Sequence, residues 1–377
     1  MKVIIHGATN GSNYGDVLFA DLFYRGACEA LPSKDVLFME MPHYGIGQFY
    51  RDELKYTSRM SLKDFFQADL LVYMSGGYFG ETTPHFKDHL KRFFRYFWIG
   101  LFYLLRKKKV VICGVGGGPI SNRMLLKVIK FIMNRAMYIT VRDHETQEYF
   151  LNNGVKNHIQ VTCDTAQVID RTMVEHIDLK EEETINQLFA DQKLIFLHVG
   201  ITPKDDVKFQ NIVEGLNRFL RKHPEYGVIF GNDGKSNFDI NQFKSIKSLQ
   251  CEKKYFYKYS SAWQLTALLN KVDFVITPKL HVGIISSSLG KSVVSFPVHK
   301  QKTLRYYRQI GEEGRCKLFS EVNPEIVEQM IETYHDKPIT IDDSIRRTAK
   351  MNIEVMKSAI QTARMESSNK YEKAYSK

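Results

Sequence analysis

Cysteine is scarce in this chain, and no apolar run is long enough to cross a bilayer. The five cysteines are scattered without any C-x-x-C spacing, so zinc ribbons and redox motifs are excluded and reduced thiols in a cytoplasmic protein are expected. The longest apolar stretch, Phe93–Leu105, is interrupted by Arg95 and falls short of the roughly 20 residues that a spanning helix needs. The N-terminus also lacks the apolar core of a signal peptide.

Several signatures of nucleotide, metal and nucleophile chemistry are missing as well. The sequence contains no G-x-G-x-x-G, no Walker A loop and no G-x-S-x-G elbow. His85 and His89 share one helical face, but no third ligand is evident, so we expect no metal. Nucleic-acid motifs are not found either, and no nucleic-acid partner is expected, although salt-sensitive oligonucleotide binding would support a binding module without turnover.

Positive charge is what the chain has in excess. Lysine and arginine outnumber aspartate and glutamate by 53 to 42, a formal net charge of +11 over 377 residues. Such a surface suits anionic partners, such as phosphorylated metabolites or lipid head groups. The length favours two domains.

Short apolar runs alternate with amphipathic helical stretches, which predicts an α/β fold with parallel sheets. The sequence turns acidic and polar between about 167 and 192, and a new strand then begins. We therefore expect two similar halves facing a cleft, at 1–180 and 190–340. A terminal helix at 344–363 is expected to pack on the body, and the tail at 364–377 to be frayed.

Ligands of open α/β sheets bind beyond the carboxyl ends of the strands, so the turns after strands are the candidate sites. Glycine-rich turns follow three N-terminal strands, where the backbone can approach a ligand closely. Their candidate residues are Asn13, Gly15 and Asp16 in the first turn, Gly76 and Gly77 in the second, and Gly116 and Gly117 in the third.

Four residues in turns after strands have two interpretations each. Asp16 is either a catalytic carboxylate or a helix N-cap. Arg142 has two possible roles: it binds the carboxylate or phosphate of a ligand, or it forms an ion pair with Asp143 within the loop. Lys279 and His281 open a helix whose dipole favours anions, although a histidine in a first turn is often only a surface or packing residue.

The stretch Phe93–Leu105 is flanked by bases, with Lys91, Arg92 and Arg95 before or within it and 106–109 after it. This pattern is typical of a helix lying on an anionic membrane. A buried helix with solvated ends is the alternative.

An ordered series of motifs resembles the polysaccharide pyruvyl transferase family over roughly residues 3 to 310. The series consists of GSNYGD at 11–16, SGG at 75–77, GVGGGPI at 114–120, VRD at 141–143, CDTA at 163–166 and KLHVGIISSSLGKSVVSF at 279–296. The resemblance implies two Rossmann-like domains arranged as in GT-B glycosyltransferases. It also implies phosphoenolpyruvate as donor and a surface or exopolysaccharide glycan, lipid-linked or polymeric, as acceptor.

In the family motif, an arginine and an R-L-H triplet are associated with the donor, and they fall here on Arg142 and on Lys279 to His281. Lysine in place of arginine keeps the charge but loses the bidentate grip. The resemblance thus implies a phosphoenolpyruvate site with Arg142, Lys279, His281 and the amides of Gly116 and Gly117. His281 is the candidate acid and Asp16 the candidate base.

Ketal formation from phosphoenolpyruvate needs no redox cofactor, so none is expected. The alternative function is a GT-B-type glycosyltransferase that uses a nucleotide sugar, since fold alone does not decide between them. For the transferase, a cytoplasmic location with a peripheral contact at the inner face of the membrane is the expectation.

Overall fold

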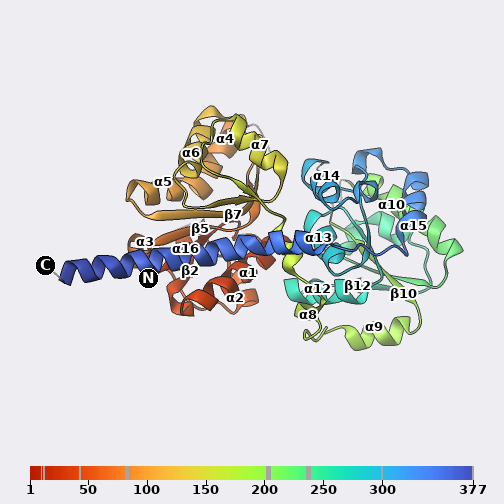
Figure 1. The fold of residues 1–377 in the computed structure, drawn as a ribbon. Coiled ribbons are helices and arrows are strands. Elements are labelled where there is room, and N and C mark those ends of the chain that lie inside the picture. Colours follow the sequence, from red (N-terminus) through yellow and green to blue (C-terminus); the bar gives the residue numbers. More distant parts are fainter. Residues whose placement is uncertain are drawn as a thin grey trace. The chain divides into compact units, whose positions relative to one another are not determined.

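The computed structural model describes residues 1–9, 11, 13–41, 44–80, 85–200, 205–234, 239–298 and 300–375. The chain divides into two compact α/β units (Figure 1). The first comprises Met1–Ser12, Asp16–Thr165 and Ser344–Lys377, and the second comprises Asn13–Gly15 and Ala166–Asp343.

The division after Thr165 lies earlier than the expected boundary near 180–190. The Ser288 hydroxyl donates hydrogen bonds to the carbonyls of Gln167 (3.1 Å) and Ile169 (2.6 Å). Arg171 Nε donates to the Leu289 carbonyl at 2.9 Å. The segment after residue 165 is therefore part of the second unit, although its polar sequence has the composition of a linker.

The first unit is built on a parallel sheet in the order β2-β1-β5-β7-β8-β9, with β6 paired to β7. Its central strands are buried along their length, as expected for strands covered on both faces. The strands are β1 (Val3–His6), β2 (Val36–Phe38), β5 (Leu70–Tyr73), β6 (Gly76–Phe79), β7 (Lys109–Gly117), β8 (Ile139–Val141) and β9 (Gln160–Val161). A separate antiparallel pair is formed by β3 (Glu40–Met41) and β4 (Tyr44–Gly45).

Helices flank this sheet (Figure 1), and some of them close a large apolar core with it. They are α1 (Tyr14–Ala30), α2 (Gln48–Leu54), α3 (Leu62–Gln67), α4 (Phe86–Arg92), α5 (Trp98–Leu105), α6 (Arg123–Met133), α7 (His144–Asn152) and α16 (Asp343–Tyr375). A π-helical turn, η2 (Phe93–Phe97), joins α4 to α5.

The second unit has the strand order β12-β11-β10-β13-β14, again all parallel. Its strands are β10 (Lys193–His198), β11 (Tyr226–Gly231), β12 (Lys254–Tyr257), β13 (Phe274–Thr277) and β14 (Ser292–Ser295). Its helices are α8 (Arg171–Val174), α9 (Glu182–Phe189), α10 (Asp206–Lys222), α11 (Lys244–Lys247), α12 (Ala262–Lys271), α13 (Leu280–Ser288), α14 (Lys300–Gln309) and α15 (Pro324–Tyr334).

The terminal helix α16 completes the first unit. Asn352 is fully buried, and its side-chain oxygen accepts hydrogen bonds from the hydroxyls of Thr140 (2.6 Å) and Thr162 (2.8 Å). Its amide nitrogen donates to the Cys163 carbonyl and to Thr165 Oγ1, both at 2.9 Å. The helix continues to Tyr375, beyond the end expected at 363.

Two glycine-rich segments that were expected to be turns are strands instead. Gly76 and Gly77 open β6, and β7 continues through Gly116 and Gly117 to its end. The backbone here lies close to neighbouring side chains. A β-carbon at Gly117, for example, would lie 2.5 Å from the Phe150 ring. At Gly117 the absence of a side chain makes room for this packing. Gly76 has a φ of 154°, a backbone conformation that favours glycine.

The stretch Phe93–Leu105 combines features of both its interpretations. Phe97, Ile99 and Tyr103 are buried in the first core, whereas Phe94 and Leu105 are 59% and 67% exposed. No helix among the described residues is both long and apolar enough to span a bilayer.

Candidate functional site

The strand order of the second unit reverses between β10 and β13, which is where open α/β sheets bind ligands. Each of these strands ends in a polar residue. His198 closes β10 and Thr277 closes β13, and His198 Nδ1 lies 2.8 Å from Thr277 Oγ1. Both side chains are fully buried. Thr277 Oγ1 also accepts the backbone N–H of Lys279 at 3.0 Å, which fixes the turn that leads into α13.

A carboxylate from the neighbouring strand joins this pair. Asp233 follows β11, and its Oδ1 lies 3.4 Å from His198 Nε2. Burial by itself would raise the pKa of Asp233, but His198 and Lys279 nearby lower it to about 2. Asp233 is therefore ionised at neutral pH and opposes the charge of Lys279.

Gly200 brings the backbone close to both basic side chains. A β-carbon at this position would lie 2.8 Å from His198 Nε2 and 2.9 Å from Lys279 Cε. Only a residue without a side chain fits there. His198 and Lys279 thus approach the same point at the edge of the sheet.

His281 is the second residue of α13, and Lys279 is the residue before that helix, so both lie at the positive end of its dipole. The His281 ring packs against Gly15 of the same unit, where a β-carbon would overlap His281 Nδ1. The structure therefore brings together Gly15, His281, Lys279 and His198 in the second unit.

Sequence reasoning singled out neither His198 nor Asp233. The sequence signal for a site role of these two residues is their position. Each is a polar residue at or just after the end of an apolar run, and the two runs become adjacent parallel strands. The pairing register of β10 with β11 and β13 makes them neighbours of Lys279.

The first unit reverses its strand order between β1 and β5. Asp16 lies in the first turn of α1 and is half-buried, and its Oδ1 is 3.9 Å from the position of a β-carbon on Gly76, just after β5. Asp16 is not the N-cap. The Asn13 side chain accepts the Gly15 N–H at 3.1 Å and fills that place. Ser12 of the same motif lies outside the described residues.

Arg142 is buried and paired, and its main partner is not the adjacent Asp143. Its Nη1 donates to Asp164 Oδ2 at 3.0 Å, whereas its Nε lies 3.8 Å from Asp143 Oδ2. Asp143 instead caps α7 by accepting the Thr146 N–H at 2.7 Å. Gly116 lies against the guanidinium, because a β-carbon there would be 2.5 Å from Arg142 Nε.

One of the two histidines considered for metal binding, His89, has another side-chain contact. His89 is buried and lies 3.3 Å from Ser121 Oγ, and His85 precedes α4. Within the described residues, one group could hold an ion by distance alone, namely His223, Glu332 and His335 in the second unit.

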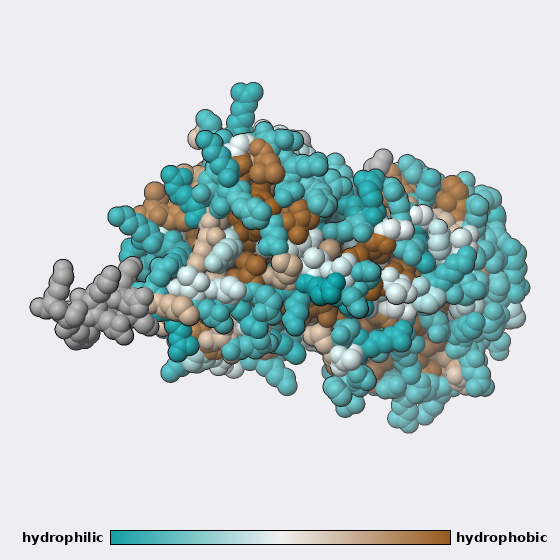
Figure 2. All heavy atoms as spheres, in the orientation of Figure 1, coloured by the Kyte–Doolittle hydropathy of each residue, from teal (hydrophilic) through white to brown (hydrophobic). Residues whose placement is uncertain are grey.

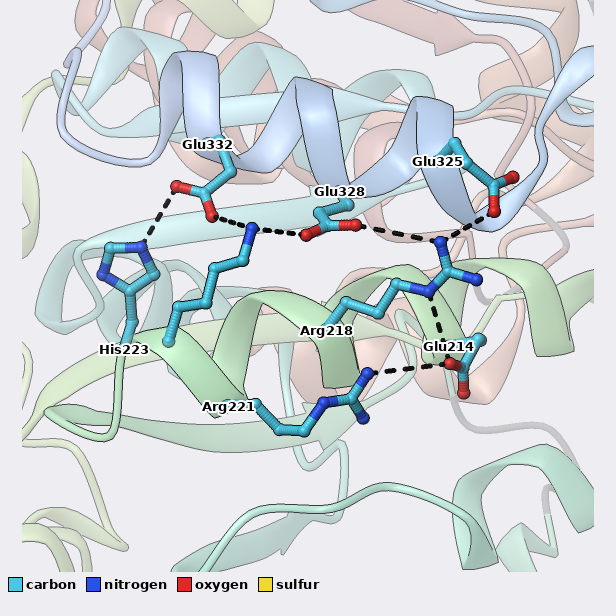
Figure 3. Close-up of polar contacts among 8 residues, drawn as sticks. Glu214, Arg218, Arg221, His223, Glu325, Glu328 and Glu332 are labelled. Carbon is cyan, nitrogen blue, oxygen red and sulfur yellow. Dashed lines mark hydrogen bonds and ion pairs between the residues drawn. The ribbon is translucent and has the colours of Figure 1, made fainter.

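Two of these residues, His223 and Glu332, belong to an ion-pair row that joins α10 to α15 (Figure 3). His335 Nδ1 lies 3.0 Å from the Tyr226 hydroxyl. Glu332 already accepts from His223 Nε2 at 3.1 Å and from Lys222 at 3.4 Å. Lys222 also reaches Glu328 at 2.6 Å, and Arg218 reaches Glu325 at 2.7 Å. Alternating charges thus join the two helices.

Comparison with known proteins adds a family and a fold. A family model described as polysaccharide pyruvyl transferase matches residues 13–300. The comparison with curated proteins gives no match.

Solved structures resemble the chain over nearly its whole length. A putative UDP-N-acetylglucosamine 2-epimerase from Listeria monocytogenes has a TM-score of 0.64 at 14% identity, covering 96% of this chain and 97% of that one. The UDP-GlcNAc 2-epimerase from Methanocaldococcus jannaschii has a TM-score of 0.62 at 12% identity, and the match covers 94% of this chain and 98% of that one. The UDP-GlcNAc 2-epimerase from Neisseria meningitidis, bound to UDP-GlcNAc, has a TM-score of 0.61 at 12% identity, and the match covers 94% of this chain and 99% of that one. These likenesses concern the fold, and they confirm the two Rossmann-like domains of GT-B type.

Proposed function

Because the chain belongs to the polysaccharide pyruvyl transferase family and is a transferase of polysaccharide biosynthesis, we propose that it transfers pyruvate from phosphoenolpyruvate to a pair of sugar hydroxyls. The product is a pyruvate ketal on a surface or exopolysaccharide glycan. We place the reaction in the cytoplasm, with a lipid-linked or polymeric glycan as acceptor and a peripheral contact at the inner face of the membrane.

The observation that carries this proposal is the basic edge of the second unit. Lys279 and His281 stand at the start of α13, and His198 and Lys279 approach the backbone of Gly200. A carboxylate and a phosphate on three carbons need cations and oriented amides, which this edge offers. Arg142 of the first unit is the further donor-binding cation that the family motif adds.

The chemistry balances without electron transfer. A proton from His281 adds to the methylene carbon of phosphoenolpyruvate and makes C2 electrophilic. One sugar hydroxyl attacks C2 and gives its proton to Asp16. A second hydroxyl then attacks C2, the C2–O bond to phosphate breaks, and inorganic phosphate leaves. The two hydroxyls lose two protons in total. One of them passes through the buffer and replaces the proton that His281 gave to the new methyl group, and the other ends on phosphate.

Phosphate release tests the proposal. The purified protein is incubated with phosphoenolpyruvate and sugar acceptors, and phosphate and ketal are followed by NMR. We expect Lys279→Ala to weaken donor binding and His281→Ala to abolish turnover, while Lys244→Ala, an exposed lysine of α11, matches the unaltered protein. Full activity in Lys279→Ala and His281→Ala would remove both residues from the site.

Arg142→Ala is measured in the same assay. Since Arg142 is paired with Asp164, its loss also affects stability, so donor affinity is compared with that of Asp164→Asn. Weakened binding in Arg142→Ala alone supports a role toward the donor. Equal loss in both variants assigns Arg142 to folding only.

A second candidate function uses a nucleotide sugar. It is favoured by the likeness to enzymes whose descriptions name UDP-GlcNAc, including the Neisseria structure bound to that compound. Release of UDP from UDP-sugars, with no phosphate from phosphoenolpyruvate, would replace the first proposal by this one.

A further inference from the structure

An apolar stripe runs along the outside of the first unit on the continuous helical segment from α4 through η2 to α5. Phe86, Leu90 and Phe94 are 69%, 47% and 59% exposed, and Leu105 at the far end is 67% exposed. Large apolar side chains scattered singly on a surface are ordinary, but four on one helical segment form a patch that calls for a partner.

The π-helical turn keeps the stripe on one face. Residues four apart drift around an ideal helix of 3.6 residues per turn. The turn at Phe93–Phe97 takes up an additional residue, which offsets part of this drift. Phe86, Leu90, Phe94 and Trp98, which is half-buried, therefore stay aligned.

The opposite side of the same segment is anchored. Tyr96, Phe97, Ile99 and Tyr103 are buried in the first core, and Tyr103 donates a hydrogen bond to the Phe65 carbonyl at 2.7 Å. The exposed side chains cannot turn inward without breaking this packing. The stripe is thus a fixed surface of the folded unit.

Helix α3 widens the apolar surface at one end. Phe66 is 45% exposed, and its ring lies 5.9 Å from that of Phe102. The Arg106 guanidinium lies over both rings, at 5.4 and 5.6 Å. Figure 2 shows apolar surface gathered over the α4, α5 and α6 region of this unit, bordered by hydrophilic residues.

The charge around the stripe is of one sign. Between residues 86 and 109 there are eight bases (Lys87, Lys91, Arg92, Arg95, Arg106, Lys107, Lys108 and Lys109) and one acid, Asp88. Some are engaged, since Arg92 binds the Gly80 carbonyl and Lys109 pairs with Glu366. Lys87, Lys91 and Lys107 are exposed, and within the described chain they make no ion pair.

We propose that this surface, consisting of Phe86, Leu90, Phe94 and Leu105 with Lys87, Lys91 and Lys107, docks the protein on an anionic lipid bilayer. Aromatic and leucine side chains enter the boundary between head groups and acyl chains, while lysines bind the anionic head groups. This deepens the proposed function by naming the surface that contacts the membrane.

The charge favours a membrane over a second copy of the chain. A twofold dimer through this surface would place the same cations opposite one another. An anionic bilayer neutralises them instead, and each lysine near such a surface contributes about fivefold to binding.

Vesicle sedimentation without any substrate tests the docking. The full chain is mixed with vesicles of phosphatidylcholine, alone or with about one third phosphatidylglycerol, at low and high salt. We expect binding only to the anionic vesicles, reduced by salt. Failure to bind them overturns the docking proposal, whatever the outcome of the phosphate-release assay.

Matched variants locate the surface. The triple variant Phe86→Ser, Leu90→Ser, Phe94→Ser should bind anionic vesicles at least tenfold more weakly. Val207→Ser, at an apolar position of the second unit that is even more exposed, should not change binding. Lys87→Gln, Lys91→Gln, Lys107→Gln should lose most of the salt-sensitive binding, whereas Lys208→Gln, Lys244→Gln, Lys247→Gln should retain it.

The substituted residues are exposed, so the fold of each variant can be verified by circular dichroism and by phosphate release with a soluble acceptor. A folded stripe variant that still binds vesicles like its control would overturn the assignment. A chain that forms dimers through the stripe and ignores vesicles would assign the surface to self-association instead.

Discussion

The His281 imidazole lies directly against the backbone of Gly15, on the side where any other residue would carry a β-carbon. The glycine of the first motif thus determines the position of a side chain more than 260 residues away in the chain. Both residues belong to the second unit, so this contact joins the N-terminal motif to the start of α13.

Gly15→Ala should displace His281 and lower turnover about a hundredfold, because an ångström of misplacement in a catalytic group costs that much. Steady-state phosphate release measures the effect. Gly47→Ala is the control, since a β-carbon there would meet no atom within 4 Å. Unchanged turnover in Gly15→Ala would show that His281 does not act from its position against residue 15.

His6, buried at the end of β1, should make the first unit sensitive to acid. Burial lowers its pKa to about 4 from the ordinary 6.5, although backbone hydrogen bonds oppose this effect. The unfolded chain therefore binds a proton between these values that the folded unit does not. Stability is complete above about pH 6.5 and falls as the pH drops toward 4, by roughly 3 kcal/mol.

Urea unfolding monitored by Trp98 fluorescence in a Trp263→Phe background measures this dependence, because each unit contains one of the two tryptophans. His6→Gln should flatten the curve between pH 4 and 6.5, and His144→Gln, at an exposed position, should leave it unaltered. A steep curve that persists in His6→Gln would assign the sensitivity to another group.

Asp233 should produce a dependence of the same direction in the second unit, but at lower pH. Burial would raise its pKa, but His198 and Lys279 lower it to about 2, below the ordinary 3.8. A depressed carboxyl pKa gives stability that is present above about pH 4 and lost as the pH falls toward 2. The expected size is on the order of 2 kcal/mol, measured by Trp263 fluorescence in a Trp98→Phe background.

The matched pair for that measurement is Asp233→Asn against Asp336→Asn. Asp336 is exposed, so its substitution should leave the loss of stability between about pH 4 and pH 2, here called the acid limb, unaltered. Asp233→Asn should remove this loss. Retention of the full acid limb in Asp233→Asn would contradict an ionised carboxylate beside His198.

Breaking the Arg142–Asp164 pair should destabilise the first unit by about 3 kcal/mol, since removal of one partner leaves a buried charge uncompensated. Asp164→Leu and Arg142→Met are each compared with the double variant that combines these two substitutions, which should recover part of the loss. Urea unfolding at neutral pH measures the three variants. Additive losses would mean that the two side chains are not coupled in this way.

The second sheet could be anticipated in detail because its strands are uninterrupted apolar runs between amphipathic helices. The strand expected to begin after about residue 192, for example, is β10, which starts at Lys193. In the first unit, glycine pairs obscured the strands, since Gly76 and Gly116 are typical of turns although both lie in the sheet. The short β2 was not anticipated.

The candidate site was less accessible to sequence reasoning, because its contacts join distant strands. His198 meets Thr277 across 79 residues, and Arg142 pairs with Asp164 rather than with its neighbour. Lys279 and His281 could be identified because a strand, a proline and a helix start are adjacent in the chain. Whether these residues bind the donor stays a prediction.

The burial of Asn352 among Thr140, Thr162 and Thr165 has a consequence for biosynthesis. A nascent chain that has left the ribosome only as far as Asp343 contains every described segment of the second unit, yet its first unit still lacks the helix that satisfies those hydroxyls. The unit whose translation begins first is therefore the one that is completed last.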